Sequence, residues 1–359
     1  MSKARELAEL GAAYDSGALS NRNIIINGAM QCWQRATSAV PAANGYNTVD
    51  RWKHFESSAG AYTTEQSTDH PTGTGYSLKC QVTTADTSIA AGEYAFTETN
   101  LEGQDCQRFQ YGTSTAKDVT VSFWVKSNKT GIYCAALYKI AGSGTAYMYR
   151  KEYTIDAANT WEKKVIIISP TAGSTALITA SAGAVPNSNV AGFQLVFGLA
   201  WGSNYHGTDN TWQTGSGYGT SNQVNWMDST SNNFYLTEVQ LEAGTEATPF
   251  EHRSIGDELA RCQRYYQFNL PHTGYTNTTT VCRIPITGSE EMRANPSISV
   301  ISGTNAIEDF GVANRNLSSL ASLSGATTFG GFSDATIASS TASKPHGLFP
   351  KAIALDAEL

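Results

Sequence analysis

Short runs in which apolar and polar residues alternate are the feature that most constrains the fold of this chain. Such a period of two is typical of a β-strand with one face in a core and the other partly wet. In the clearest run, residues 119–126, the apolar members are Val119, Val121, Phe123 and Val125. Further runs of β character span residues 23–26, 133–138, 146–153, 164–168 and 193–199. Many short strands and few helical patterns predict an antiparallel sandwich or jelly roll.

One predicted strand breaks the alternation. Phe234 and Leu236 share one parity, whereas Val239 and Leu241 have the other. A β-bulge adds one residue to a strand and so returns later side chains to the original face. We therefore predict a bulge around residues 237–238, which keeps all four apolar side chains on the core face.

The two ends of the chain depart from this β pattern. Residues 1–21 predict a short helix and a linker, and the apolar stripe of the helix is Ala4, Leu7 and Leu10. A second helical pattern begins near Asp257, the candidate N-cap. Residues 318–343 are rich in Gly, Ser and Thr and contain few large apolar residues, so the last region has a thin core of its own.

These patterns predict an all-β protein with two domains. Single cores stop growing at about 250 to 300 residues, and this chain has 359. We expect a jelly-roll β-sandwich followed by a smaller C-terminal β domain, with a short N-terminal helix and a linker helix. The predicted boundaries are 1–21 for the N-terminal helix and linker, 22–252 for the sandwich, 253–268 for the linker helix and 269–359 for the C-terminal domain, which is expected to mediate oligomerisation or to face a receptor.

Composition and charge argue against several classes of function. The net charge is −7, only 15% of the residues are charged, and no run of Lys or Arg is present to neutralise nucleic-acid phosphates. No apolar stretch approaches the roughly 18 residues that span a bilayer. We therefore expect neither nucleic-acid binding nor membrane insertion. The charged N-terminus is unlike a signal peptide, which predicts synthesis in a cytoplasm without export by that route.

Sequence motifs for catalysis are missing. The six cysteines lie far apart without CxxC spacing, and no HExxH, GxSxG or P-loop motif occurs. A glycan-cleaving enzyme needs two carboxylates about 5 to 9.5 Å apart. No motif supports pairs such as Asp209 with Asp228 or Glu238 with Glu242, so we predict that the protein is not an enzyme.

The most informative candidate for binding is a long insertion between two strands, residues 201–226. Sugars present apolar C–H faces to aromatic rings, while amides and carboxylates take their hydroxyls. Long loops on rigid scaffolds often carry function. In the alternative, the rings anchor the loop to its own sandwich or to a neighbouring subunit. The candidate carbohydrate-binding residues are Trp201, Tyr205, Asp209, Trp212, Tyr218 and Trp226.

Several short motifs follow one another along the chain. They are Asn23-Ile-Ile-Ile-Asn-Gly-Ala-Met30 with Trp33, Asp50-Arg-Trp52, Val121-Ser-Phe-Trp-Val-Lys-Ser127, Val239-Gln-Leu-Glu-Ala-Gly244, Ala247-Thr-Pro-Phe-Glu-His-Arg253 and Glu258-Leu-Ala-Arg-Cys-Gln-Arg-Tyr-Tyr266. In this order they resemble the jelly-roll modules of bacteriophage tail fibres and virion spikes, over roughly residues 22–268. Residues 292–297 and 356–359 also resemble pieces of the C-terminal domains of such fibres.

This resemblance implies a virion protein that forms a homotrimer. Its N-terminal helix would bind another virion protein, and its distal part would attach to polysaccharide on the host cell surface. Each site would be weak, and three copies would add avidity. In the alternative, the protein is a structural virion component, a capsid decoration or a tail adaptor, without receptor binding.

The jelly roll also resembles carbohydrate-binding modules, some of which hold a structural Ca²⁺ between their first and last strands. The resemblance implies Glu242 as a ligand, because Ca²⁺ prefers oxygen ligands such as carboxylates. At the first-strand position this sequence has Met30 and Gln31, where those modules often have an acidic residue. An ordinary solvated Glu242 is therefore the alternative. No other cofactor is expected.

The predicted anchor can be tested by deletion. Removing residues 1–20 should release the protein from virus particles and leave the sandwich folded, because the deleted segment precedes the first β pattern. Sedimentation of particles with bound protein, together with circular dichroism of the truncated chain, measures both effects. Retained attachment would refute the anchor.

Overall fold

The computed structural model describes only part of the chain. The described residues are 3, 21–140, 145–215, 217–268, 273–278, 281–302, 306–309, 313–320, 324–328, 330–337, 345–348 and 352–359. The chain divides into two compact units between Ser254 and Ile255. The predicted anchor residues Ala4, Leu7 and Leu10 lie outside the described residues. Within the described part, no helix has the length and apolar character to cross a bilayer.

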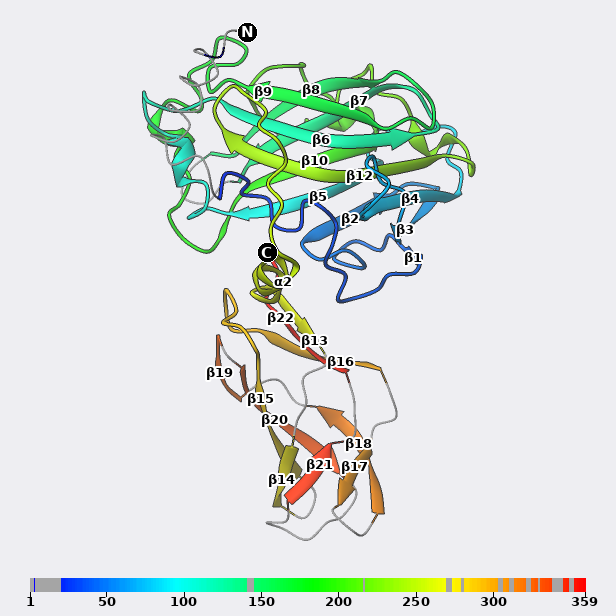
Figure 1. Ribbon diagram of the computed structural model, residues 1–359, viewed down its shortest axis with the longest axis vertical. Helices are drawn as coiled ribbons and strands as arrows, with labels where there is room; N and C mark the ends of the chain where they lie inside the picture. The colour runs from blue at the N-terminus through cyan, green and yellow to red at the C-terminus, as the bar shows by residue number, and fades with distance from the viewer. Residues whose placement is uncertain are drawn as a thin grey trace. The chain divides into compact units, whose positions relative to one another are not determined.

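The first unit is a sandwich of two six-stranded antiparallel sheets, which lie in two layers in Figure 1. Sheet A contains, in spatial order, β1 (Val40–Pro41), β3 (Ala61–Ser67), β4 (Ser77–Thr84), β12 (Asn233–Ala243), β6 (Val119–Ser127) and β9 (Glu162–Ile168). Sheet B contains β11 (Gln213–Thr214), β8 (Tyr147–Ile155), β7 (Gly131–Lys139), β10 (Ala191–Trp201), β5 (Tyr94–Glu102) and β2 (Trp52–Ser57). This architecture confirms the predicted all-β jelly-roll class.

In the described residues of this unit, four short 3₁₀ helices lie in the loops. They are η1 (Gln107–Phe109), η2 (Ser181–Gly183), η3 (Ser203–Tyr205) and η4 (Trp226–Asp228). Two of them, η3 and η4, belong to the long insertion between β10 and β12, so this insertion has local structure of its own.

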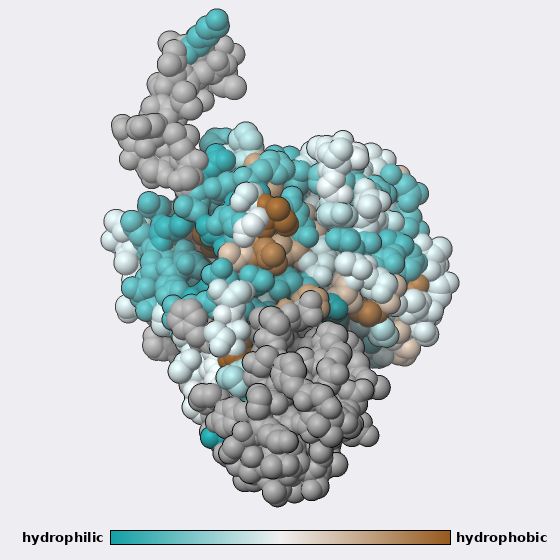
Figure 2. All heavy atoms as spheres, turned by 60° about the horizontal axis from the view of Figure 1, so that its bottom comes forward, coloured by the Kyte–Doolittle hydropathy of each residue, from teal (hydrophilic) through white to brown (hydrophobic). Residues whose placement is uncertain are grey.

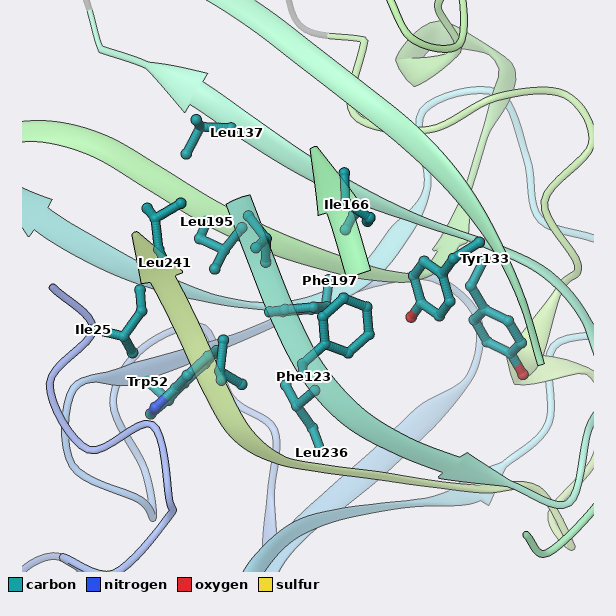
Figure 3. Packing of buried hydrophobic residues seen from close by; sticks show 14 of the residues in the cluster. Ile25, Trp52, Phe123, Tyr133, Leu137, Ile166, Leu195, Phe197, Leu236 and Leu241 are labelled. Atoms are coloured by element: carbon teal, nitrogen blue, oxygen red, sulfur yellow. The ribbon is translucent and has the colours of Figure 1, made fainter. Parts of the chain in front are cut away.

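The core of the sandwich lies between the two sheets. Phe123 of β6 and Phe197 of β10 face each other across it (Figure 3), with ring centroids 4.9 Å apart and planes at 74°. Edge-to-face packing of this kind is favourable for aromatic rings. The predicted inward face of β6 is confirmed, since Val119, Val121, Phe123 and Val125 are all buried.

The predicted bulge in β12 is also confirmed. The register with β6 shifts between Thr237 and Gln240, and Glu238 adopts a positive φ of 48°. The shift lets β12 change parity without losing its core face. The four apolar residues Phe234, Leu236, Val239 and Leu241 are all fully buried.

The predicted strand at residues 23–26 is wrong. This segment is not part of a strand, and besides one backbone bond, from Ile24 N–H to Leu241 O at 3.1 Å, it contacts β12 through the Asn23 side chain. Asn23 Oδ1 accepts hydrogen bonds from the backbone N–H groups of Ile25 and Leu241, at 2.9 and 3.1 Å. Side chains of this type compete with the backbone for such bonds. The segment therefore lies beside β12 without extending the sheet.

The second unit begins with α2 (Ile255–Gln263), which starts two residues before the predicted N-cap Asp257. A three-stranded sheet follows the order β13 (Tyr266–Phe268), β22 (Ala352–Asp356) and β16 (Ser297–Ser302). A seven-stranded sheet contains β15 (Val281–Thr287), β14 (Thr273–Thr278), β21 (Pro345–Leu348), β17 (Ala306–Asp309), β18 (Ala313–Leu320), β20 (Gly330–Ile337) and β19 (Ser324–Thr327). Pairing of β15 with β20 closes six of these strands on themselves.

Hydrophilic residues cover most of the surface of the first unit that Figure 2 shows, and hydrophobic residues form only small groups there. Among the described residues of this unit, the exposed large hydrophobic side chains are Tyr76, Val165, Ile167 and Val190. Scattered apolar residues of this kind are normal on a folded surface.

The core face of β12 gives a stability prediction. Leu236→Ala should lower the free energy of unfolding by about 2–5 kcal/mol, because it leaves a cavity at a fully buried position. Val165→Ala, at a site that is 48% exposed, should change it by less than about 0.5 kcal/mol. Urea unfolding measures both, and equal losses would contradict the assigned core.

Candidate functional site

Seven aromatic side chains gather on the outward side of sheet B, the side away from the core. We call this set the aromatic face. Five of its rings are half-buried, whereas Phe96 and Trp201 are nearly covered. The set comprises Phe55 from β2, Tyr94 and Phe96 from β5, Tyr138 from β7, Trp201 from the end of β10, Tyr205 from η3 and Tyr218 from the insertion.

Three rings of this face are close to parallel. Trp201 stacks on Phe96 and on Tyr218, with ring centroids 4.9 and 5.1 Å apart and planes at 24° and 13°. Tyr94 and Tyr205 pack beside Trp201, at 6.4 and 5.7 Å. The rings thus hold one another in fixed orientations, and the partly exposed ones present a pre-organised apolar surface.

Two glycines make room for the central indole. A Cβ atom on Gly198 would lie 2.0 Å from Trp201 Nε1, and one on Gly219 would lie 2.3 Å from Trp201 Cδ1. Any larger residue at either position would therefore displace the ring. The β10 register with β5 also shifts between Gly198 and Ala200. This irregularity lets Trp201 fold back over its own strand.

Hydrogen bonds join parts of the insertion to one another and to β8 of sheet B. The backbone N–H of Gly219 donates to Tyr205 O and that of Gly207 donates to Gly219 O, at 3.0 and 2.8 Å. On β8, Arg150 donates to Thr208 O at 3.2 Å, and Glu152 accepts from Thr220 Oγ1 at 2.5 Å. These contacts fix Tyr205 and Tyr218 against the sheet, so both rings belong to a rigid surface.

The predicted residue Asp209 holds the insertion in place. Its carboxylate forms an ion pair with Lys151 at 2.7 Å and accepts the backbone N–H of Glu152 at 2.8 Å. Both partners are on β8. In this structure Asp209 therefore anchors the loop to β8 through both oxygens.

The structure contradicts the predicted sugar contacts of Trp212 and Trp226, because both rings are fully buried in the core. Trp212 packs against Tyr149 at 5.4 Å, and its Nε1 donates to Ser169 O at 2.9 Å. Trp226 packs edge-on against Tyr62 at 5.7 Å. These two rings anchor the insertion to its own sandwich, which was the alternative that the sequence left open.

A buried carboxyl lies next to the aromatic face. Glu98 of β5 pairs in register with Lys53 of β2 and with Val196 of β10, and it accepts a hydrogen bond from Gln194 Nε2 at 3.2 Å. Burial raises the pKa of Glu98 to about 7, although the charge of Lys53 lowers it. Burial, followed by the charge of Glu98, raises the pKa of Tyr218. The charge of Glu98 therefore acts on Tyr218, one of the stacked rings.

The predicted calcium ligand has other partners. Glu242 Oε1 accepts hydrogen bonds from Gln240 Nε2 and from the backbone N–H of Thr248, both at 2.9 Å. Its Oε2 accepts from Thr248 Oγ1 at 2.7 Å. A calcium ion here would have to replace these bonds. In the part of the chain that the structure describes, no three His, Cys, Asp or Glu side chains come together as metal ligands.

The carboxylates considered for catalysis each have a structural partner. Asp228 pairs with Lys129, and it accepts from Asn232 Nδ2 at 2.8 Å. Glu238 lies 3.5 Å from His70 Nε2. Together with the bonds of Asp209 and Glu242, these contacts show that all four carboxylates hold loops or strands in place.

A hollow of about 430 Å³ lies elsewhere, between β8 and β9. Its two lysines are already paired, Lys151 with Asp209 and Lys164 with Asp156 at 3.1 Å. None of the aromatic-face residues lines it. We therefore place the candidate site on the open aromatic face and not in this hollow.

The sequence missed Phe55, Tyr94, Phe96 and Tyr138 as members of this face. Tyr94, Phe96 and Glu98 share one parity within β5, which is a detectable signal. Their meeting with Tyr138 depends on the order of strands in sheet B, where β10 separates β5 from β7. Such long-range neighbours do not follow from local periodicity.

No protein-family model and no curated protein sequence matches this chain. Among solved structures, it is similar to a domain of bacteriophage CBA120 tailspike protein 4, with 13% identity and a TM-score of 0.31 over 62% of this chain and 21% of that one. It is also similar to the family 11 carbohydrate-binding module of Clostridium thermocellum Lic26A-Cel5E, with 13% identity and a TM-score of 0.29 over 60% of this chain and 99% of that one. It is also similar to the family 22 module of Clostridium thermocellum Xyn10B, with 14% identity and a TM-score of 0.30 over 55% of this chain and 89% of that one.

The buried carboxyl gives a pH prediction. Between pH 4.5 and about 7 the folded chain keeps the Glu98 proton while the unfolded chain loses it, so the contribution of Glu98 to stability falls as the pH rises through this range. Glu98→Gln removes that loss and keeps an acceptor for Gln194. Its free energy of unfolding relative to wild type should rise by about 3 kcal/mol across this range.

Urea unfolding at a series of pH values measures this difference. Glu246→Gln, at an exposed position, serves as the matched control and should show a much smaller change. A stability difference for Glu98→Gln that stays constant with pH would contradict the buried, proton-retaining state of Glu98.

Proposed function

We propose that the protein binds saccharides through the aromatic face of sheet B. The half-buried tyrosines of this face carry this proposal, because the stacked and nearly covered rings of Phe96 and Trp201 support them from below. Sugar rings present apolar C–H faces that lie flat on such rings. A rigid platform binds with a smaller entropic cost, because its side chains are already ordered.

Polar groups suited to sugar hydroxyls surround the rings. Tyr94, Tyr138, Tyr205 and Tyr218 are half-buried, and within the described residues none of their hydroxyls makes a hydrogen bond. A phenol can both donate and accept. An apolar surface with a few convergent polar groups is the usual composition of a small-molecule site, so the tyrosine hydroxyls would orient the bound sugar.

We extend this proposal to the biological role that the sequence motifs imply. In this role the protein is a non-catalytic component of a virion fibre or spike, a homotrimer that attaches to polysaccharide on the host cell surface. Multivalent display would raise the avidity of individually weak sites. The helix that the sequence predicts at the N-terminus would hold the protein to another virion protein.

A purely structural role in the virion is the second candidate. The observation that favours it is the burial of Trp212 and Trp226 in the core, since part of the aromatic insertion serves the sandwich itself. This role requires no ligand on the aromatic face, so binding measurements separate the two candidates.

Binding to bacterial cells tests the proposal. The labelled protein, sized as its native oligomer, is added to a panel of bacterial strains before and after their surface polysaccharide is stripped. We expect binding to at least one strain and its loss on stripping. Tyr205→Ala and Tyr218→Ala should each weaken that binding about tenfold or more, because each removes a half-exposed ring of the platform.

Tyr76→Ala is the matched control, since Tyr76 is an exposed ring outside sheet B. It should leave binding unchanged. An absence of binding to every strain, or equal binding by all three variants and the wild type, would overturn the proposal and favour the structural role.

A further inference from the structure

A second set of aromatic and charged side chains lies on the outward side of sheet A. We propose that this set, the lysine patch, is a separate site for an acidic saccharide such as a uronate oligosaccharide. The lysine patch comprises Glu65, Asp69, Lys79, Lys126, Trp161, Lys163 and Tyr235. It belongs to the other sheet, so the inference does not depend on the aromatic face.

The centre of the lysine patch is a fixed ammonium group. Lys126 Nζ lies 4.4 Å from the ring centroid of Tyr235 and 5.3 Å from that of Trp161. Ammonium groups are attracted to aromatic rings at such distances. Asp69 pairs with Lys126 and accepts a hydrogen bond from Trp161 Nε1 at 2.9 Å. The indole is therefore oriented from its edge while it remains half-exposed.

Asp69 keeps its negative charge in this arrangement. Its partial burial opposes ionisation, but hydrogen bonds from Lys126 and Trp161 lower the pKa of Asp69 below its usual value. The carboxylate therefore holds both partners in place across the neutral pH range. The ring of Trp161 is therefore pre-organised, which lowers the entropic cost when a sugar stacks on it.

Neighbouring strands add further cations in register. On β4, Lys79 lies directly opposite Tyr235 of β12, and Lys79 pairs with Glu65 at 2.6 Å. On β9, Lys163 lies opposite Trp124 of β6, and Trp161 immediately precedes this strand, two residues before Lys163. Side chains two residues apart share a face of a strand, about 6.6 Å from each other.

The charge balance of the lysine patch favours an anion. It contains three ammonium groups, on Lys79, Lys126 and Lys163, against the two carboxylates of Asp69 and Glu65. Lys163 is exposed, and within the described residues no ion pair involves it. The surplus positive charge lies on a chain whose net charge is −7. An acidic polysaccharide would be repelled by most of this surface and attracted to the lysine patch.

The chemistry of the lysine patch matches a carboxylated sugar. Trp161 and Tyr235 pack edge-to-face, with ring centroids 6.1 Å apart and planes at 66°. The half-exposed ring of Trp161 can therefore take the apolar face of a pyranose ring while Tyr235 lies at its side. The Lys163 ammonium can donate to the sugar carboxylate, and a charge-assisted bond is stronger than a neutral one. The carboxylates of Asp69 and Glu65 can accept from ring hydroxyls. A neutral sugar would use the rings but not the surplus charge.

Calorimetry on the full chain tests this inference. The probes are tetrasaccharides of galacturonate, glucuronate, mannuronate and guluronate, each compared with the neutral tetrasaccharide of the corresponding hexose. At least one uronate should bind more tightly than its neutral counterpart, and raising NaCl from ~0.05 M to ~0.5 M should weaken it because salt screens exposed charge. Trp161→Ala should reduce that affinity about tenfold, and Lys163→Gln about threefold.

Two controls separate this site from the aromatic face. Lys117→Gln removes one exposed ammonium that precedes β6, at the opposite end of this strand from Lys126, and it should leave uronate binding unchanged. Tyr205→Ala should also leave it unchanged. The inference is overturned if no uronate binds, if Trp161→Ala and Lys163→Gln bind as the wild type does, or if Tyr205→Ala alone removes uronate binding. Only the last result would show that the uronate binds on the aromatic face instead.

Discussion

The packing of two six-stranded sheets through their inward side chains is the interaction on which the rest of this structure depends. Because successive residues of a strand face opposite sides, each strand that supplies the core must also supply the outer surface. In β5, the inward Ala95 and Leu101 alternate with the outward Tyr94, Phe96 and Glu98. Both proposed binding surfaces lie on the outward sides of the two sheets, so the rings that strands carry, such as Phe96 of β5 and Tyr235 of β12, share the rigidity of the core.

The alternation of inward and outward residues along each strand also explains how much of the fold could be predicted. Local periodicity was sufficient for the inward face of β6 and for the bulge in β12, because each follows from the parity of neighbouring residues. It failed at residues 23–26, where the apolar run is real but the side chain of Asn23 binds the backbone of β12 instead. The hydrophobic pattern of a segment does not show whether a polar side chain binds the neighbouring backbone in this way.

The candidate site was less accessible to prediction, for two physical reasons. An aromatic residue in a loop can point into the core or onto a surface, and sequence alone did not separate Trp212 from Tyr218. The surrounding rings come from strands that meet only through the order of sheet B. Trp201 also needs the space that Gly198 and Gly219 leave. The candidate site is thus a product of tertiary structure around a loop that the sequence singled out.

Nuclear magnetic resonance of ring-labelled tyrosine tests the central claim most directly, which is that saccharide binds on the outward aromatic side of sheet B. The protein is titrated with fragments of the surface polysaccharide from a strain that it binds. We predict changes in the ring signals of Tyr94, Tyr138, Tyr205 and Tyr218, with little change in core rings such as Tyr149. Unchanged signals from all four surface rings at saturating ligand would contradict the account.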